Sequence, residues 1–219
     1  METTQTKRAL VVGGTGLIGK KLVELLLKSN LYEEVRVLIR KSTGITHPRL
    51  VEVKYNFKQP DATQVIGDDV FCCLGTTMKQ AGSKEAFFAV DYEYPLQIAR
   101  FARQKGATRY LIVTAMGANA ESTFFYNRVK GEVEEDLQTL NYPSLHLFRP
   151  SLLTGDRSEK RLGERVGESV LNFLKPIMKG PLEKYQPIEA EKVAKAMLTQ
   201  AQTTSKGVII HESPELQTY

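Results

Sequence analysis

Tyr126 and Lys130 are four residues apart in the segment "STFFYNRVKGEVEEDLQTL", residues 122–140. Val129, Val133 and Leu137 recur there at helical spacing, so the segment predicts a helix that begins at a serine or threonine cap. Residues i and i+4 of a helix share one face, about 6 Å apart along the axis. The ammonium would then lie near the phenol and favour the phenolate, as a general acid/base for alcohol and carbonyl chemistry requires. Tyr and Lys at this spacing are also ordinary surface neighbours, so the rest of the sequence must distinguish a catalytic pair from a surface pair.

That context includes the stretch "LVVGGTGLIGKKLVELLL", residues 10–27, which begins as a strand and ends as a helix. Gly13, Gly16 and Gly19 form the pattern G-x-x-G-x-x-G in the bend between them. The three glycines would allow a tight turn, a close approach of the backbone to a pyrophosphate, and close packing of the helix on the sheet. The helix would direct its free N–H groups at the phosphates. A turn without a ligand is the alternative.

Two basic residues stand where dinucleotide-binding folds of this kind carry an acid that binds the ribose hydroxyls of NAD. The second predicted strand ends in "RVLIRKST", with Arg40 and Lys41 at this position. A guanidinium can pair bidentately with a 2′-phosphate, which an acid would repel. The sequence therefore favours NADP (NADPH) over NAD, mainly through Arg40. The alternative is that both side chains are merely solvated at a strand end.

Strands and helices alternate along the chain, and this alternation must position these residues. Apolar, β-branched runs predict strands at 9–13, 34–40, 50–56, 70–75, 109–115, 144–151 and 207–213. Helical periodicity predicts helices at about 17–28, 84–105, 122–140, 163–179 and 188–202. Such alternation indicates an α/β fold with a doubly wound parallel sheet of order 3-2-1-4-5-6 and an extra edge strand. We expect one domain over 1–219, with the less regular segment 152–187 capping the substrate side.

Composition narrows the class of protein. The chain has 219 residues, 42% of them apolar and 25% charged, which is typical of a folded globular domain. Cys72 and Cys73 are adjacent in an apolar run and the three histidines are far apart, so we expect no metal site. The net charge of +5 is dispersed, which argues against nucleic acid. No segment reaches the roughly 18 apolar residues of a membrane span, and no signal-type region is seen, so we expect no membrane partner and a cytoplasmic location.

The chain also resembles a known family over nearly its whole length. The glycine turn and the segments "FCCLGTT", "YLIVTAMGA", "YNRVK", "FRPSLLTGDR" and "IEAEKVAKAM" resemble the atypical branch of the short-chain dehydrogenase/reductase superfamily. The segments "CCLGTTMKQAG", "VDYEYPLQIA" and "YNRVKGEVEEDL" are similar to the oxidoreductase family named for its Tat-interacting human member. The resemblance implies a Rossmann fold that binds NADP and transfers a hydride between NADPH and a small carbonyl or alcohol substrate.

Each element of the expected site has its counterpart in this resemblance. The phosphate-binding turn is matched by Gly13, Thr15, Gly16, Leu17, Ile18 and Gly19, and the 2′-phosphate site by Arg40 and Lys41. The loop along the adenine and ribose is matched by Leu74, Gly75 and Thr76, and the turn bordering the nicotinamide amide by Pro150, Ser151 and Leu152. Tyr126 and Lys130 match the catalytic tyrosine and lysine, and the lysine is expected to bond the nicotinamide ribose as well.

Two positions depart from the family pattern. Asn56 stands where many relatives carry an aspartate that binds the adenine amino group. Ala115 stands where a serine or threonine should donate a hydrogen bond to the substrate oxygen, with Thr114 one residue earlier. Thr114 is our candidate for this catalytic donor, provided that the strand has ended or bulged before it; otherwise it bonds nearby backbone. Losing such a donor typically costs about two to three orders of magnitude in rate.

Three functions therefore remain open. The first is the NADPH-dependent oxidoreductase, and the second is a catalytically weak, NADPH-sensing regulatory protein that binds a protein partner. The third, a protein acting on a nucleotide-sugar or flavin substrate, would need a larger cap than 152–187 offers. The oligomeric state stays open between monomer and homodimer.

Several other residues receive a structural interpretation. Phe124 and Phe125 are expected to divide between the core and the wall of an apolar substrate pocket. The acidic run "GEVEEDL" predicts a solvated helix face, and Asp156 with Arg157 a solvated charge pair.

Overall fold

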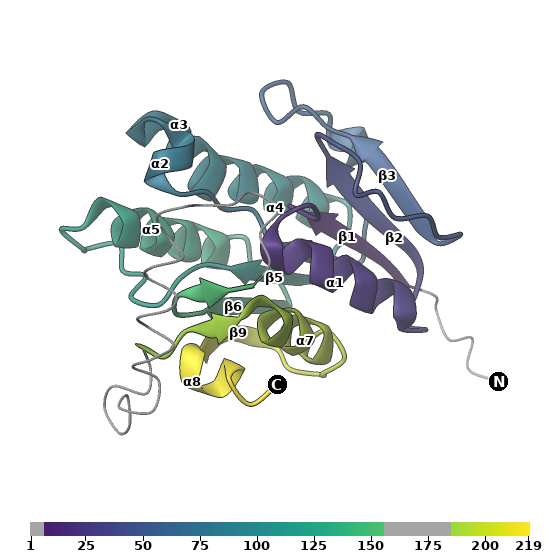
Figure 1. Cartoon of the computed structure of the whole chain (residues 1–219). Helices are drawn as coiled ribbons and strands as arrows, with labels where there is room; N and C mark the ends of the chain where they lie inside the picture. Colours follow the sequence, from purple (N-terminus) through teal and green to yellow (C-terminus); the bar gives the residue numbers. More distant parts are fainter. Residues whose placement is uncertain (1–6, 156–184) are drawn as a thin grey trace.

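The computed structural model describes residues 7–155 and 185–219, and its centre is a parallel sheet of seven strands (Figure 1). The strands are β1 (Lys7–Val12), β2 (Tyr32–Ile39), β3 (Leu50–Lys54), β4 (Asp69–Cys72), β5 (Arg109–Val113), β6 (Ser144–Arg149) and β9 (Gly207–Glu212). Their order in the sheet is β3-β2-β1-β4-β5-β6-β9, and every neighbouring pair is parallel. This confirms the predicted α/β fold, its strand order and the additional edge strand. A separate parallel pair joins β7 (Leu153–Thr154) to β8 (Ile188–Glu189).

Helices cover both faces of the sheet (Figure 1). The longer ones are α1 (Leu17–Lys28), α4 (Tyr94–Gln104), α5 (Phe125–Thr139) and α7 (Ala190–Gln200). The shorter ones are η1 (Ala62–Gln64), α2 (Met78–Ala81), α3 (Lys84–Phe88), the π-helical turn η2 (Ala89–Glu93) and α8 (Ser213–Leu216). The apolar stripes of α1 and α7 pack on one face, and those of α4 and α5 on the other.

The strand residues alternate between these two cores. Ala9 and Val11 of β1 belong to the core under α1 and α7, whereas Leu10 and Val12 belong to the core under α4 and α5. This alternation follows from the two-residue period of a strand, and it explains why the strands read as continuous apolar runs. Parallel strands place their carboxyl ends at one edge, where the order reverses between β1 and β4. Doubly wound sheets bind ligands at such a reversal.

Three of the predicted helices differ from those in the structure. The helix expected at 84–105 consists of α3, the π turn η2 and α4 in succession. Helix α5 begins at Phe125 rather than at a serine or threonine, and no side chain caps it; the Ser122 hydroxyl instead accepts a hydrogen bond from the Phe124 N–H. The strand β8 takes the first two residues of the helix expected at 188–202. The helix expected at 163–179, the pair Asp156 and Arg157, and most of the expected cap lie outside the described residues.

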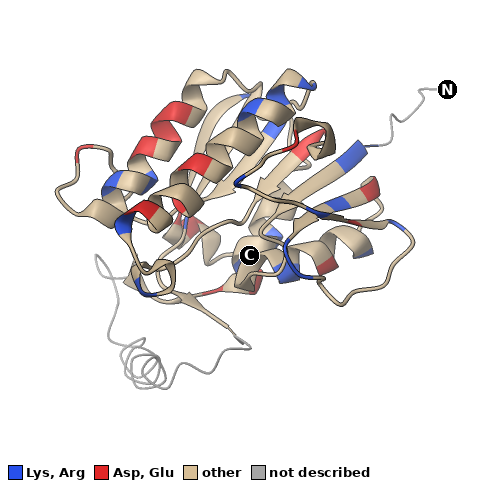
Figure 2. Ribbon diagram, turned by 90° about the horizontal axis from the view of Figure 1, so that it is seen from above, with Lys and Arg blue, Asp and Glu red and all other residues tan. Residues whose placement is uncertain are grey.

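Charged residues of both signs occur on the helices and loops of the described chain, and Figure 2 shows them interspersed along the same elements. Among the helices of the described ranges, none is long and apolar enough to cross a membrane.

Candidate active site

The glycine turn lies against the loop that follows β4. Gly13 has φ +80°, a conformation that favours glycine, and a Cβ there would lie 2.5 Å from the Cys73 carbonyl oxygen. A Cβ on Gly19 would overlap the Gly13 carbonyl, and a Cβ on Gly14 would lie 2.5 Å from Val37 of β2. Three glycines are therefore required by close contacts with β2, with the β4 loop and within the turn itself.

The start of α1 offers an anion-binding cradle. Gly16 is the N-cap in extended conformation, and no side chain caps the helix. The turn is closed by a hydrogen bond from the Gly16 N–H to the Gly13 carbonyl, 3.0 Å long. An uncapped helix N-terminus beside a tight glycine turn suits the pyrophosphate of a dinucleotide. Thr15, Leu17 and Ile18 complete this turn, and Leu17 also lies beside Gly155 after β7.

Lys130 is a buried cation with a buried partner. Its side chain on α5 is 5% exposed, and Nζ lies 2.6 Å from Oδ1 of Asp91, which is 1% exposed and belongs to the π turn η2. The other carboxylate oxygen, Oδ2, accepts the Thr76 N–H at 2.9 Å. A Cβ on Gly75 would lie 3.5 Å from Asp91 Oδ1 and 3.9 Å from Lys130 Nζ. The structure thus places Gly75 and Thr76 of the loop after β4 beside Lys130 and its partner Asp91.

The environment of Lys130 holds it in the charged form. Burial by itself lowers the pKa of the Lys130 ammonium, but the Asp91 carboxylate and then Tyr126 act in the opposite direction. The net effect is a pKa above the usual value for lysine. Lys130 is therefore a permanent charge at neutral pH, fixed in position by Asp91.

Tyr126 lies one helical turn before Lys130 and is 40% exposed, so its phenol is open to solvent. Its ring packs against Phe87 of α3, with centroids 5.6 Å apart. The neighbouring Phe124 is 74% exposed, whereas Phe125 is half-buried between Phe87 and the Lys84 cation. The expected division between core and pocket wall is therefore not observed: Phe125 is only half-buried outside the two core clusters, and Phe124 is an exposed apolar side chain two residues before the tyrosine.

Thr114 does follow the end of β5, but its hydroxyl is engaged. The Oγ1 atom donates to Glu134 Oε1 at 2.5 Å, and Glu134 is 2% exposed. Arg149 at the end of β6 forms a double hydrogen bond to the same carboxylate and a 3.1 Å ion pair with Glu212. A hydroxyl carries one proton, so Thr114 in this arrangement cannot also donate to a substrate. The expectation that Glu134 belongs to a solvated face is wrong, because Arg149 compensates its charge inside the protein.

The turn after β6 is joined to the loop after β5. The Met116 N–H donates to the Pro150 carbonyl at 3.0 Å, and Ala115 and Ser151 are both 8% exposed. Leu152, by contrast, is 52% exposed. The buried methyl of Ala115 and the exposed side chain of Leu152 therefore border the same edge of the sheet as Tyr126.

The residues expected at the adenosine end are exposed. Arg40 and Lys41 follow the end of β2 directly, and Asn56 follows β3. The Asn56 side chain accepts the Lys58 N–H at 3.1 Å. Arg40 and Lys41 are thus open to solvent at the carboxyl end of β2, the strand that pairs with β1 beside the glycine turn.

Two residues of this region, Asp91 and Glu134, were not predicted from the sequence. Asp91 is an acid within the apolar run "FFAVDYEYP", a pattern that indicates a paired buried charge. Glu134 continues the spacing of Tyr126 and Lys130 by four more residues, so all three share one stripe of α5. Both signals were present in the sequence.

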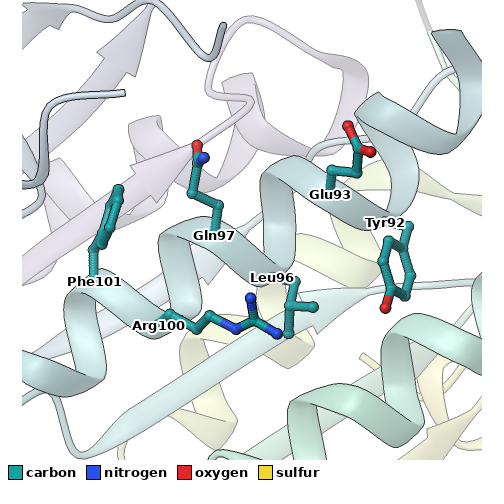
Figure 3. Close-up of a pocket in the computed structure, with 6 residues that line it drawn as sticks. All are labelled: Tyr92, Glu93, Leu96, Gln97, Arg100 and Phe101. Atoms are coloured by element: carbon teal, nitrogen blue, oxygen red, sulfur yellow. The ribbon is translucent and has the colours of Figure 1, made fainter. Parts of the chain in front are cut away.

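A surface hollow of about 430 Å³ lies elsewhere, along α4 (Figure 3). It is lined by Tyr92, Glu93, Leu96, Gln97, Arg100 and Phe101. Tyr92 points from it toward α5, where its hydroxyl bonds Asp136. None of the expected site residues lines this hollow. Among the described residues, no group of three or more His, Cys, Asp or Glu could hold a metal ion.

Comparison with known proteins places this geometry in a family. The sequence profile of the NAD(P)H-binding family matches residues 13–155. Protein HTATIP2 of Rattus norvegicus is 36% identical over 176 residues, covering 78% of this chain and 72% of its own length. Protein FMP52, mitochondrial, of Candida albicans is 30% identical over 205 residues, covering 90% and 89%.

Solved structures share the fold at low identity. MoeE5 in complex with UDP-glucuronic acid and NAD has a TM-score of 0.70 at 14% identity, over 93% of this chain and 75% of that one. UDP-N-acetylglucosamine 4-epimerase from Methanobrevibacter ruminantium M1 has a TM-score of 0.70 at 18% identity, over 95% and 77%. These likenesses confirm the Rossmann architecture.

The names of the FMP52 relatives correct one expectation. The FMP52 proteins of Scheffersomyces stipitis, Candida albicans and Eremothecium gossypii are all named mitochondrial. The expected cytoplasmic location is therefore wrong as a deduction, because the lack of an apolar segment does not distinguish the cytosol from an organelle. The glycine cradle, the Tyr126–Lys130 stripe and the matches together establish that the chain belongs to the NAD(P)H-binding family, as an atypical short-chain dehydrogenase/reductase related to HTATIP2.

Proposed function

We propose that the protein binds NADPH and catalyses hydride transfer between it and a small carbonyl or alcohol substrate. The observation that carries this proposal is the pairing of an exposed phenol with a buried cation on one helical stripe. Tyr126 is open to a ligand, and Lys130 is locked in place by Asp91. Burying an ion pair costs desolvation energy, and apolar side chains at these positions would stabilise the helix at least as well. Stability alone therefore does not account for the pair.

The residues divide the work as follows. The Tyr126 phenol donates its proton to the carbonyl oxygen while that carbon gains the hydride, which gives an alcohol. The Lys130 ammonium stabilises the resulting phenolate and binds the nicotinamide ribose. The cofactor supplies the hydride. The glycine turn holds the pyrophosphate, the loop Leu74–Thr76 borders the ribose, and Pro150–Leu152 border the nicotinamide.

NADP is the cofactor that the adenosine end favours. Arg40 and Lys41 follow β2 as exposed cations, and a guanidinium pairs bidentately with a 2′-phosphate. An acid, which would bind the hydroxyls of NAD, is absent from these two positions.

The geometry around Thr114 favours a second candidate function. Ala115 has no hydroxyl, and the Thr114 proton is donated to Glu134. A site that binds NADPH yet lacks this donor suits a catalytically weak sensor of NADPH that contacts a protein partner.

The test is reduction of benzaldehyde, cyclohexanone and 9,10-phenanthrenequinone by the purified protein, followed through NADPH fluorescence. We expect turnover of at least one carbonyl, and Tyr126→Phe should lower kcat by about 10²- to 10⁴-fold with little change in NADPH affinity. Tyr94→Phe is the matched control, because Tyr94 belongs to α4 and stacks on Phe57, and it is not part of the α5 stripe that carries Lys130. Full activity of Tyr126→Phe would remove the catalytic assignment. NADPH binding without turnover of any carbonyl would favour the sensor.

A further inference from the structure

Three backbone polar groups of the turn after β6 are hydrogen-bonded within the protein. The Pro150 carbonyl accepts from Met116, and the Leu152 carbonyl accepts from the Ile188 N–H at 2.9 Å. The Ser151 N–H donates to Ser213 Oγ at 3.1 Å, a bond between residues 62 positions apart. The turn is therefore preformed, and its N–H at Ser151 is not available to a ligand.

Ser213 belongs to α8, which the sequence did not predict to be part of the site. It is the first residue of α8, which follows β9 directly, and it is 1% exposed. The residue before it, Glu212, pairs with Arg149 at 3.1 Å, next to the turn. His211 Nδ1 lies 2.8 Å from Glu215 Oε1, which ties α8 back to β9. The end of β9 and the start of α8 thus hold the turn at two points, Arg149 and Ser151.

The contacts with β9 and α8 also determine which side chain of the turn is exposed. Leu152 is 52% exposed, while Ser151 is buried and its hydroxyl donates to the Gln186 carbonyl. Toward a ligand the turn therefore offers an apolar side chain on a fixed backbone. A flat heteroaromatic ring is suited to such a contact, and a backbone fixed in advance lowers the entropic cost of binding.

We propose that Ser213 is a positioning residue for the nicotinamide half of NADPH: by accepting the Ser151 N–H it fixes the turn that places Leu152 against that ring. This inference rests on the proposed function. Ser213 itself touches neither cofactor nor substrate, and the adenosine half, bound by the glycine turn and Arg40, is independent of it.

The independence of the two halves supplies the test. Isothermal titration of Ser213→Ala with NADPH and with 2′,5′-ADP, which lacks the nicotinamide, separates positioning from general damage. We expect about tenfold weaker NADPH binding and 2′,5′-ADP binding within about twofold of the unmodified chain. Ser29→Ala is the control, because the Ser29 hydroxyl is half-buried and donates to the Leu26 carbonyl of α1 at 2.8 Å, outside the contacts that hold the turn. It should leave both affinities unchanged.

Glu212→Gln provides a second variant if Ser213→Ala does not fold, because its side chain is half exposed. As with Ser213→Ala, we expect a selective loss for NADPH, with about two- to threefold weaker NADPH binding and unchanged 2′,5′-ADP binding. Equal losses for both ligands, or no loss for either, would overturn the positioning role. If the unmodified chain bound neither NADPH nor 2′,5′-ADP, the proposed function itself would fail, which is a different result.

Discussion

Lys130 Nζ lies 2.6 Å from Asp91 Oδ1, and both side chains are almost completely buried. The two residues belong to separate elements, α5 and the π turn η2, so the pair joins the helix that carries Tyr126 to the segment that precedes α4. Water cannot solvate either charge, so each residue depends on the other for its counter-charge.

Asp91→Asn should therefore be strongly destabilising. It leaves the Lys130 ammonium buried without a counter-charge, which typically costs about 3–5 kcal/mol. Urea denaturation measures the change in the free energy of unfolding. Glu191→Gln is the control, because its pair with Lys195 leaves both side chains 48% exposed, and no measurable change is expected. Similar losses for both variants would show that burial of the Asp91 pair is unimportant.

Arg40→Asp should change the choice of cofactor. Removing the guanidinium and adding a negative charge should weaken NADPH binding by about 10- to 100-fold, while NADH binding stays equal or improves. Isothermal titration with both cofactors gives the ratio. Lys206→Asp makes the same charge change before β9, at the opposite edge of the sheet, and should leave the ratio unaltered. Unchanged NADPH affinity of Arg40→Asp would contradict the NADP assignment.

Ala115→Ser should distinguish an enzyme from a sensor. If the protein reduces carbonyls slowly for want of a donor, the new hydroxyl should raise kcat by about 10²-fold without changing NADPH affinity. Ala118→Ser is closely matched, since Ala118 is also 8% exposed and lies in the same loop. It should have no effect on kcat. An Ala115→Ser variant that binds NADPH and stays inactive would favour the sensor.

A histidine pair between β6 and β9 predicts a pH dependence of stability. His146 Nδ1 lies 2.9 Å from His211 Nε2, and its Nε2 lies 2.9 Å from Ser144 Oγ. Burial, followed by the charges of His211 and Arg109, lowers the pKa of His146 to about 4. The folded state binds the His146 proton less tightly than the unfolded state. The contribution of neutral His146 to the free energy of unfolding is therefore fully present above about pH 6.5 and is lost as the pH falls toward 4.

His146→Gln should flatten that dependence. The free energy of unfolding, measured in urea at several pH values between those limits, should fall less steeply than in the unmodified chain. His47→Gln, on a half-buried histidine before β3, should retain the full slope. An unaltered slope in His146→Gln would mean that carboxylates alone cause the acid sensitivity.

The sequence was sufficient for the features that depend on local spacing. The continuous apolar runs predicted the strands, and their alternation with helices predicted the sheet order. The four-residue step from Tyr126 to Lys130 predicted their common stripe. It did not reveal the partner of Lys130, because Asp91 reaches it from another helix through tertiary packing. The Thr114 hydroxyl was also undetermined: a strand end alone does not say whether the hydroxyl meets substrate or, as here, a buried carboxylate.

The π turn η2 also sets the helical phase of the segment from Lys84 to Gln104. A turn with i to i+5 hydrogen bonds holds about one residue more than an α-helical turn, which advances the residues after it by about 100°. Phe87 before the turn packs against Tyr126, while Ile98 after it enters the core beneath the sheet. If one residue were deleted from 89–93, these two contacts could not both be kept, so the length of the turn couples the ring packed against Tyr126 to the registry of the core.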